Sequence, residues 1–196
     1  MNIVVRRYGS GSCYCRPDTT SEKENRDFYV PESITDVQWS PILFVRISKA
    51  GKCIGKKFAS RYYDKFGFGA LLYCSCNKID TIDNLSIAFS SCIDHSSLLP
   101  AQSDDPSELE SAGTIYQVRK NSEVIYASGC QDGNNDLKTL IEDTVCLASQ
   151  LTSLRTGDVV AVELSEITRL ALREEKEISF AGESGNKTLF DTKIIF

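Results

Sequence analysis

The order of apolar and polar residues predicts a chain with more strand than helix. Residues 42–47 form an apolar run broken only by Arg46, between Pro41 and the polar stretch 48–51, which is typical of a buried strand. A hairpin is expected further on, where two alternating segments flank the turn residues 120–122. The other strands expected from these patterns cover residues 1–8, 70–74, 114–119, 123–128, 159–164 and 189–196.

Helical periodicity predicts a first helix over residues 52–65. Ile54, Phe58 and Tyr62 recur every four positions there and would line one face. The glycines at 67 and 69 would end this helix before the next strand.

A second helix is expected over residues 137–153, where the polar residues 134–136 can cap its first turn. Its apolar stripe would consist of Leu137, Leu140, Ile141, Val145, Ala148 and Leu151. The polar segments 9–26 and 98–113 are expected to be loops. Together these patterns predict a strand-rich α+β fold.

The composition narrows the class of protein. The 196 residues carry 27 acidic and 22 basic side chains, a net charge of −5, which disfavours binding to nucleic acid or to an anionic membrane. No stretch approaches the roughly 18–20 apolar residues that span a bilayer, and residues 1–7 become polar too early for a signal peptide. We therefore expect a cytoplasmic protein in which residues 1–196 form one domain.

Eight cysteines are expected to be free thiols, because no export signal accompanies them. Two pairs, Cys13 with Cys15 and Cys74 with Cys76, have C-x-C spacing. On a strand both thiols of such a pair point to one face, where they either chelate a soft metal or fill the core as two small residues. A zinc ribbon would need C-x-x-C pairs, and the chain has none.

Four segments carry motifs that are found together elsewhere. The longest joins the strand at 45–49 to the Gly-x-Gly at 67–69, and the others are Arg16-Pro17-Asp18, the aromatic-proline stretch 28–31 and the Gly-Asp segment 154–160. Along most of the chain this order resembles the fumarylacetoacetate hydrolase family in its short bacterial single-domain form. The resemblance implies a fold like the family's C-terminal domain, a mixed β-sheet or β-roll with a few helices. It also implies a homodimer and, in this chain, a shortened N-terminal region.

Members of that family are typically magnesium- or manganese-dependent enzymes that hydrolyse, decarboxylate or isomerise 2-oxo acids such as acylpyruvates. Three carboxylates hold the cation. The cation chelates the 2-oxo acid and stabilises the developing enolate.

The resemblance places the family's Glu-x-Glu pair at Ser40 and Ile42, and its third carboxylate at Leu71. An Ile or Leu side chain cannot coordinate a divalent cation, and one serine hydroxyl is a weak neutral ligand. No metal and no other cofactor are therefore expected, although Mg²⁺ or Mn²⁺ would be needed if the family's chemistry were retained.

Other catalytic elements of the family are absent as well. Its Arg-Asp pair falls on Ser75 and Cys76, and its lysine falls on Ser91, or on Phe89 with a two-residue shift. Its late Thr-Gly-Thr-Pro loop falls on residues 162–165. These losses favour a non-catalytic relative that acts as a binding or assembly protein, with a ligand or protein partner that the sequence does not name.

Two alternatives stay open. The first is an active hydrolase, decarboxylase or isomerase of 2-oxo acids with a relocated site. Asp80, Asp83, Asp94 and His95 are the nearest candidates, and Asp94 and His95 are the candidate catalytic residues. The second is a thiol-based metal or redox protein that uses one of the C-x-C pairs.

Overall fold

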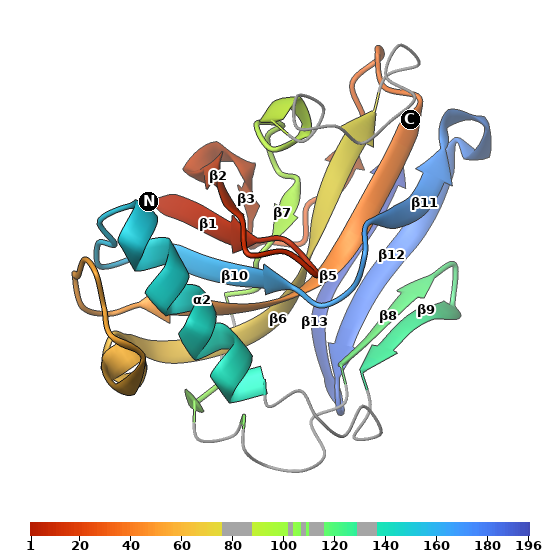
Figure 1. The fold of residues 1–196 in the computed structure, drawn as a ribbon. Helices are drawn as coiled ribbons and strands as arrows, with labels where there is room; N and C mark the ends of the chain where they lie inside the picture. Colours follow the sequence, from red (N-terminus) through yellow and green to blue (C-terminus); the bar gives the residue numbers. More distant parts are fainter. Residues whose placement is uncertain (76–87, 102–103, 107–108, 110–115, 129–136) are drawn as a thin grey trace.

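The computed structural model describes residues 1–75, 88–101, 104–106, 109, 116–128 and 137–196. Their strands form two sheets, which Figure 1 shows side by side. The first sheet runs in the order β2 (Cys13–Pro17), β1 (Asn2–Arg6), β10 (Val159–Glu163), β5 (Asp36–Ile47), β6 (Tyr63–Ser75), β7 (Ser97–Leu98) and β3 (Ser21–Glu22), with β11 (Thr168–Leu172) also paired to β5. The second runs in the order β4 (Phe28–Tyr29), β13 (Lys187–Ile195), β12 (Glu177–Ser184), β8 (Tyr116–Lys120) and β9 (Glu123–Ser128).

The helices are few. The α-helix α2 (Leu137–Leu151) lies across the first sheet in Figure 1. Short 3-10 turns accompany it, among them η1 (Asp18–Thr20), η2 (Lys56–Arg61) and η4 (Arg173–Glu175). Both sheets mix parallel and antiparallel pairs, since β1 runs parallel to β10 and β4 parallel to β13. The predicted strand-rich α+β fold, a mixed curled sheet with few helices, is confirmed.

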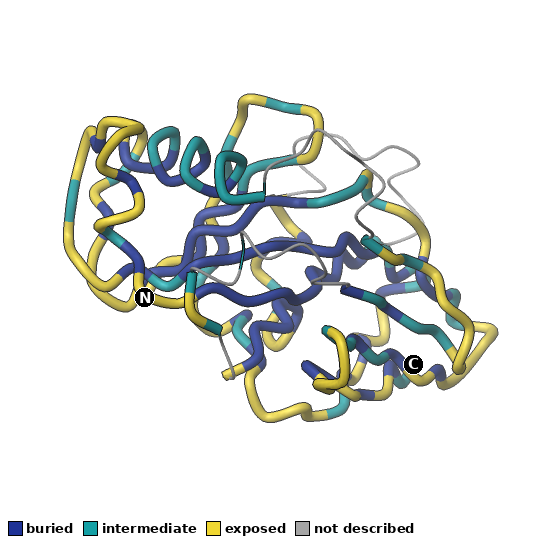
Figure 2. The backbone as a smooth tube through the Cα atoms, turned by 90° about the horizontal axis from the view of Figure 1, so that it is seen from below, coloured by how far each residue is buried: buried dark blue, intermediate teal, exposed yellow. Residues whose placement is uncertain are grey.

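The first sheet is curled so that its two edges meet. Strand β2 stands at one edge and β3 at the other, yet residues 13–22 run from β2 through η1 directly into β3. So short a connection can join opposite edges only if the sheet rolls up between them. Figure 2 shows the central strands of this roll buried along most of their length.

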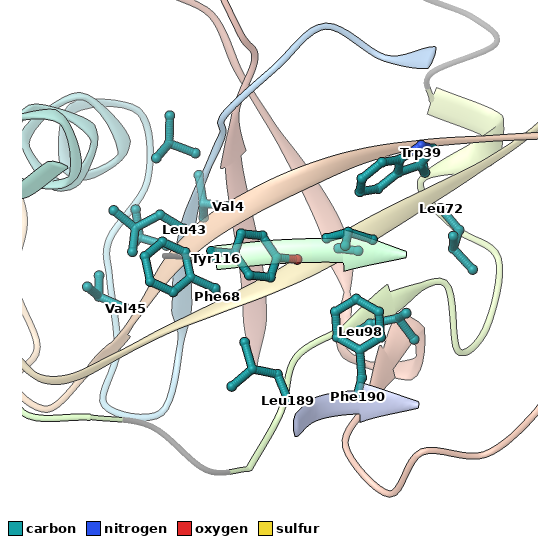
Figure 3. Close-up of a cluster of buried hydrophobic side chains, with 14 of the residues drawn as sticks. Val4, Trp39, Leu43, Val45, Phe68, Leu72, Leu98, Tyr116, Leu189 and Phe190 are labelled. Atoms are coloured by element: carbon teal, nitrogen blue, oxygen red, sulfur yellow. The ribbon is translucent and has the colours of Figure 1, made fainter. Parts of the chain in front are cut away.

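The long strands β5 and β6 separate two apolar clusters because successive side chains of a strand point to opposite faces. One face packs against α2 and the second sheet. The ring centroids of Trp39 and Phe180 are 5.3 Å apart in an edge-on contact. Phe68 stacks on Tyr116 with ring centroids 4.9 Å apart (Figure 3). The other face lines the inside of the roll. We call its buried residues the interior cluster: Ile3, Val5, Ile42, Phe44, Leu71, Tyr73, Leu99, Val159 and Ala161.

The predicted helix over residues 52–65 is wrong. Only Lys56–Arg61 form a 3-10 turn, and β6 begins at Tyr63 because that strand pairs with β5 over nearly its whole length. The glycines at 67 and 69 therefore lie inside a strand instead of ending a helix. A Cβ at Gly69 would stand 2.2 Å from the Leu98 carbonyl oxygen, so close approach of β7 requires glycine there.

The later part of the chain contains strands that the pattern did not predict. Strands β11 and β12 lie on either side of η4 within residues 168–184. Arg173 of η4 donates to the carbonyl oxygens of Pro31 and Ile34, which ties η4 to the segment before β5. In α2 the apolar stripe is correct except for Leu151, which is 62% exposed.

Candidate functional site

Ser40, Ile42 and Leu71 lie together inside the roll. Ser40 and Ile42 are alternate residues of β5 and therefore share a face. Leu71 of β6 is the direct antiparallel partner of Ser40, and Gly69 is the partner of Ile42. The three positions that the sequence resemblance singled out thus form one patch.

The three side chains of this patch are buried in the protein interior. Ile42 and Leu71 are fully buried within the interior cluster. The Ser40 hydroxyl donates to the Ser165 carbonyl oxygen at 3.0 Å, so its proton is already engaged. Aliphatic side chains and one committed hydroxyl do not match the oxygen ligands that Mg²⁺ and Mn²⁺ require. The residues present at this patch therefore do not fit a divalent cation.

A buried carboxylate that the sequence reasoning missed stands beside the patch. Glu163 ends β10, faces Ile42 across the β10–β5 pair and is 2% exposed. Its Oε1 accepts hydrogen bonds from the hydroxyls of Tyr73 at 2.5 Å and Tyr14 at 3.1 Å, while its Oε2 accepts the Tyr8 backbone N–H at 3.0 Å. The two tyrosine hydroxyls are also 2.5 Å apart. We call Glu163, Tyr14 and Tyr73 the tyrosine–carboxylate cluster.

The environment keeps both tyrosines protonated. Burial raises the pKa of Tyr14, and the nearby Arg16 guanidinium opposes this only in part. Burial, followed by Tyr14 and the charge of Glu163, raises the pKa of Tyr73 well above its ordinary value. With both hydroxyls acting as donors, the carboxylate of Glu163 is held by protein groups alone.

Arg16 joins the two sides of the roll. This arginine of β2 is 1% exposed and lies over the Tyr73 ring, with its guanidinium carbon 5.1 Å from the ring centroid. Its Nη1 and Nη2 atoms donate to four acceptors on the far side of the roll: the carbonyl oxygens of Leu72, Ser90 and Ser96, and the Ser97 hydroxyl. The Arg16-Pro17-Asp18 motif thus supplies the residue that fastens the roll closed.

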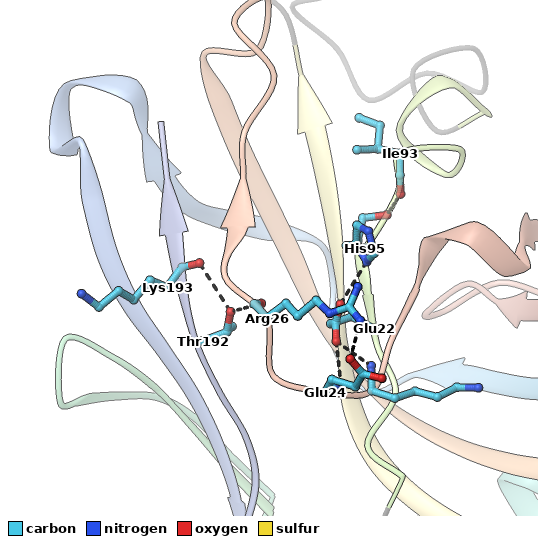
Figure 4. Close-up of polar contacts among 9 residues, drawn as sticks. Glu22, Glu24, Arg26, Ile93, His95, Thr192 and Lys193 are labelled. Atoms are coloured by element: carbon cyan, nitrogen blue, oxygen red, sulfur yellow. Dashed lines mark hydrogen bonds and ion pairs between the residues drawn. The ribbon is translucent and has the colours of Figure 1, made fainter.

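Of the candidate pair Asp94 and His95, the structure gives the histidine a different partner. His95 Nδ1 lies 2.9 Å from Oε2 of Glu22, a residue 73 positions away in the sequence (Figure 4). The Glu22 side chain is 4% exposed and that of His95 is 47% exposed. Asp94 is exposed and takes no part in this contact. The sequence offered no signal for the pairing, because β3 and β7 are too short to be read from periodicity.

Glu22 is held as a carboxylate. Burial alone would raise the pKa of Glu22, but the backbone N–H groups of Glu24, Arg26 and Lys23 together with the His95 ring outweigh burial and lower it. Its Oε1 accepts the N–H of Lys23 at 2.9 Å and that of Glu24 at 2.6 Å, which leaves Oε2 for His95.

The remaining sequence candidates fall in different places. Asp80 and Asp83 lie outside the described residues, as does Cys76. In the first C-x-C pair, burial raises the pKa of Cys13 to about 11 and also raises the pKa of Cys15. Burial raises the pKa of Cys74 to about 12. These thiols are poor thiolate ligands or nucleophiles.

No group of three or more His, Cys, Asp or Glu side chains in the described part of the chain is placed to hold a metal ion. None of the helices described in the structure has the length and hydropathy needed to cross a membrane.

The sequence matches no known family profile, and no curated protein is significantly similar to it. Solved structures, however, resemble the fold closely. A fumarylpyruvate hydrolase from Pseudomonas aeruginosa, in complex with Mn²⁺ and pyruvate, superposes with a TM-score of 0.77 at 11% identity, over 100% of this chain and 90% of that one. A Yersinia pestis protein assigned to the fumarylacetoacetate hydrolase family gives a TM-score of 0.73 at 17% identity, over 99% and 92%.

A third structure, 5-carboxymethyl-2-hydroxymuconate delta-isomerase from Mycobacterium smegmatis, gives a TM-score of 0.73 at 11% identity, over 99% of this chain and 78% of that one. These matches extend over almost the whole chain, although the identities are low. The similarity is therefore one of backbone architecture. The chain has the fold of the fumarylacetoacetate hydrolase family.

Proposed function

We propose that this protein is a relative of the fumarylacetoacetate hydrolases that has lost their metal-dependent reaction and acts as a binding or assembly protein. One observation carries the proposal. The positions that the resemblance assigns to the metal ligands, Ser40, Ile42 and Leu71, meet inside the roll and are packed as part of its core. A site filled by its own side chains offers no open coordination position for a 2-oxo acid.

Charge supports the same conclusion. A buried divalent cation needs several anionic ligands to offset the loss of its hydration. Glu163 is a carboxylate beside the patch, and protein donors already bind both of its oxygens. The Pseudomonas neighbour is described with Mn²⁺ and pyruvate. Under this proposal the chain keeps the fold but has lost the ligands of the metal.

The proposal includes a cytoplasmic homodimer as the working state, by analogy with the family. An assembly role needs only the folded surface. A binding role would use groups outside the packed interior, and the partner is not identified. Sedimentation analysis at several concentrations tests the dimer, and a monomer throughout would contradict that part of the proposal.

The central test is an assay for the lost reaction. Purified protein, dialysed against MnCl₂ or MgCl₂ and then desalted, is measured for bound metal and for turnover of oxaloacetate and fumarylpyruvate. The Pseudomonas fumarylpyruvate hydrolase serves as the positive control. We expect no stoichiometric metal and no turnover above the buffer rate. Turnover that EDTA abolishes would contradict the proposal, and Asp94→Asn and His95→Ala would then test whether the site has moved to those residues.

A further inference from the structure

The chain has one histidine, His95, and both its backbone and its ring are held in place by neighbouring groups. The backbone N–H of His95 donates to the Thr19 carbonyl oxygen at 3.2 Å. Its φ angle of 59° lies in the left-handed region, which is uncommon for a residue other than glycine. Its ring nitrogen Nδ1 is held by Glu22 at 2.9 Å. The ring is thus oriented by the structure and does not rotate freely in solvent.

The orientation leaves the second ring nitrogen available. Because Glu22 is a carboxylate and can only accept, neutral His95 carries its proton on Nδ1 and its lone pair on Nε2. No partner of Nε2 is found among the described residues, and the side chain is 47% exposed. Figure 4 shows the ring standing above Glu22 with one edge turned away from the carboxylate. The side chain that carries this lone pair is therefore partly open to solvent.

A buried carboxylate behind an imidazole changes the chemistry of its outer nitrogen. It fixes one tautomer and stabilises the positive ring that forms when Nε2 takes up a proton or an electrophile. Glu22 suits this role because three backbone N–H groups and burial keep it ionised and in place. Burial of the carboxylate also limits the screening of its interaction with the ring.

We infer that Glu22 and His95 form a nucleophilic site whose Nε2 accepts activated acyl groups. This goes beyond the proposed function, since the site lies at the β3–β7 edge of the roll, needs no metal and uses none of the interior residues. Among the residues that the structure describes, no pair of backbone N–H groups is identified beside His95 that would bind an oxyanion. The substrates of the site are therefore small acyl compounds with a good leaving group, such as aryl esters or acyl phosphates.

The Nε2 lone pair forms a bond to the acyl carbon while the bond from that carbon to the leaving oxygen breaks, and the leaving group departs as an anion. The acyl-imidazolium that results keeps its Nδ1 proton toward the Glu22 carboxylate. Water then adds to the acyl carbon, the carboxylic acid leaves with loss of one proton to solvent, and neutral His95 is restored.

The test uses p-nitrophenyl acetate with the intact protein in EDTA, from pH 6 to 8.5. The reference is N-acetylhistidine amide under the same conditions. We expect the protein to release p-nitrophenolate at least about tenfold faster per imidazole than the reference. A positioned acid–base side chain typically raises a reaction rate by about 10²-fold or more. Mass spectrometry of quenched samples should find the acetyl group on His95, which is unambiguous because no other histidine exists.

Three variants separate this site from a merely structural contact. His95→Gln should abolish the excess rate and the adduct, and Glu22→Gln should reduce the rate to that of the reference. Glu32→Gln, which alters an exposed carboxylate on another segment, should leave the rate unchanged. A Glu22→Gln rate equal to that of the unmodified protein would overturn the inference, as would hydrolysis without an adduct on His95. If Glu22→Gln fails to fold, ¹⁵N NMR of the unmodified protein gives the answer, since a proton on Nε2 of neutral His95 would overturn it equally.

Discussion

The inside of the roll and the Glu22–His95 edge each contain a buried carboxylate, but they use it differently. Glu163 is bound on both oxygens, by the hydroxyls of Tyr14 and the buried Tyr73 on one and by the Tyr8 backbone N–H on the other. Glu22 is bound by backbone N–H groups and by the ring of His95, a side chain that is partly open to solvent. A buried carboxylate whose hydrogen-bond partners belong to the packed interior stabilises the fold. A buried carboxylate can assist a reaction only where one of its partners is accessible from solvent.

The largest expected effect comes from breaking the closure of the roll. Arg16→Met removes a buried guanidinium together with the hydrogen bonds that it donates to four acceptors on the opposite wall. We expect the free energy of unfolding to fall by about 3–5 kcal/mol, measured by urea denaturation.

The matched control is Arg169→Met, because Arg169 is an exposed arginine that pairs with Asp36 at 3.2 Å. That substitution should change stability by less than about 1 kcal/mol. Similar losses for the two variants would mean that Arg16 does not fasten the roll.

A smaller effect is expected within the tyrosine–carboxylate cluster. Glu163→Gln replaces an acceptor-only group by an amide whose NH₂ must face one of the present donors, and should lower the free energy of unfolding by about 1–3 kcal/mol. Tyr73→Phe should have an effect of similar size. The double variant should lose less than the sum, since both changes break one shared contact. Strict additivity in this cycle would show that the cluster does not act as a unit.

The smallest effect concerns the Glu22 edge and depends on pH. The pKa of Glu22 lies below its ordinary value of 4.5, so its contribution to stability is complete above that value and is lost as the pH falls through the lower folded-state pKa. Unfolding measured from pH 6 down to pH 3 should therefore show a steeper loss of stability in the unmodified protein than in Glu22→Gln. We expect the difference between the two curves to be on the order of 1 kcal/mol.

The control for this window is Glu24→Gln, which removes an exposed carboxylate whose ion pair with Arg26 is also exposed. Its curve should follow that of the unmodified protein. If the Glu22→Gln curve coincided with both, the charge of Glu22 would make no contribution to the stability of the fold.

Much of the fold could be read from local patterns. The buried strands at 42–47, 70–74 and 159–164 and the hairpin at 116–128 follow from apolar runs and alternation. The failure at 52–65 has a physical cause. Spacing by four residues is compatible with a helix, but pairing with β5 extends β6 back to Tyr63, and tertiary pairing overrides a weak local preference.

The site was predictable in part. Reading the sequence against the family's pattern indicated that Ser40, Ile42 and Leu71 belong together, and the strand register places them side by side. The contact between Glu163 and Tyr73 could not be predicted from the sequence, because 90 positions separate the two residues. Asp94 and His95 were both candidate catalytic residues, and the structure pairs the His95 ring with the distant Glu22.

The sequence by itself determined the alternation that makes the strands, and therefore which residues are buried and that no acid stands at Ser40, Ile42 or Leu71. These are local properties, since a side chain's face follows from its position along its own strand. Only the tertiary structure decided which distant groups meet. The closure of the roll brings Arg16 onto the far wall, Tyr73 onto Glu163 and His95 onto Glu22. Such contacts depend on how the sheet curls and on which edges it joins, and no pattern along the chain encodes that geometry.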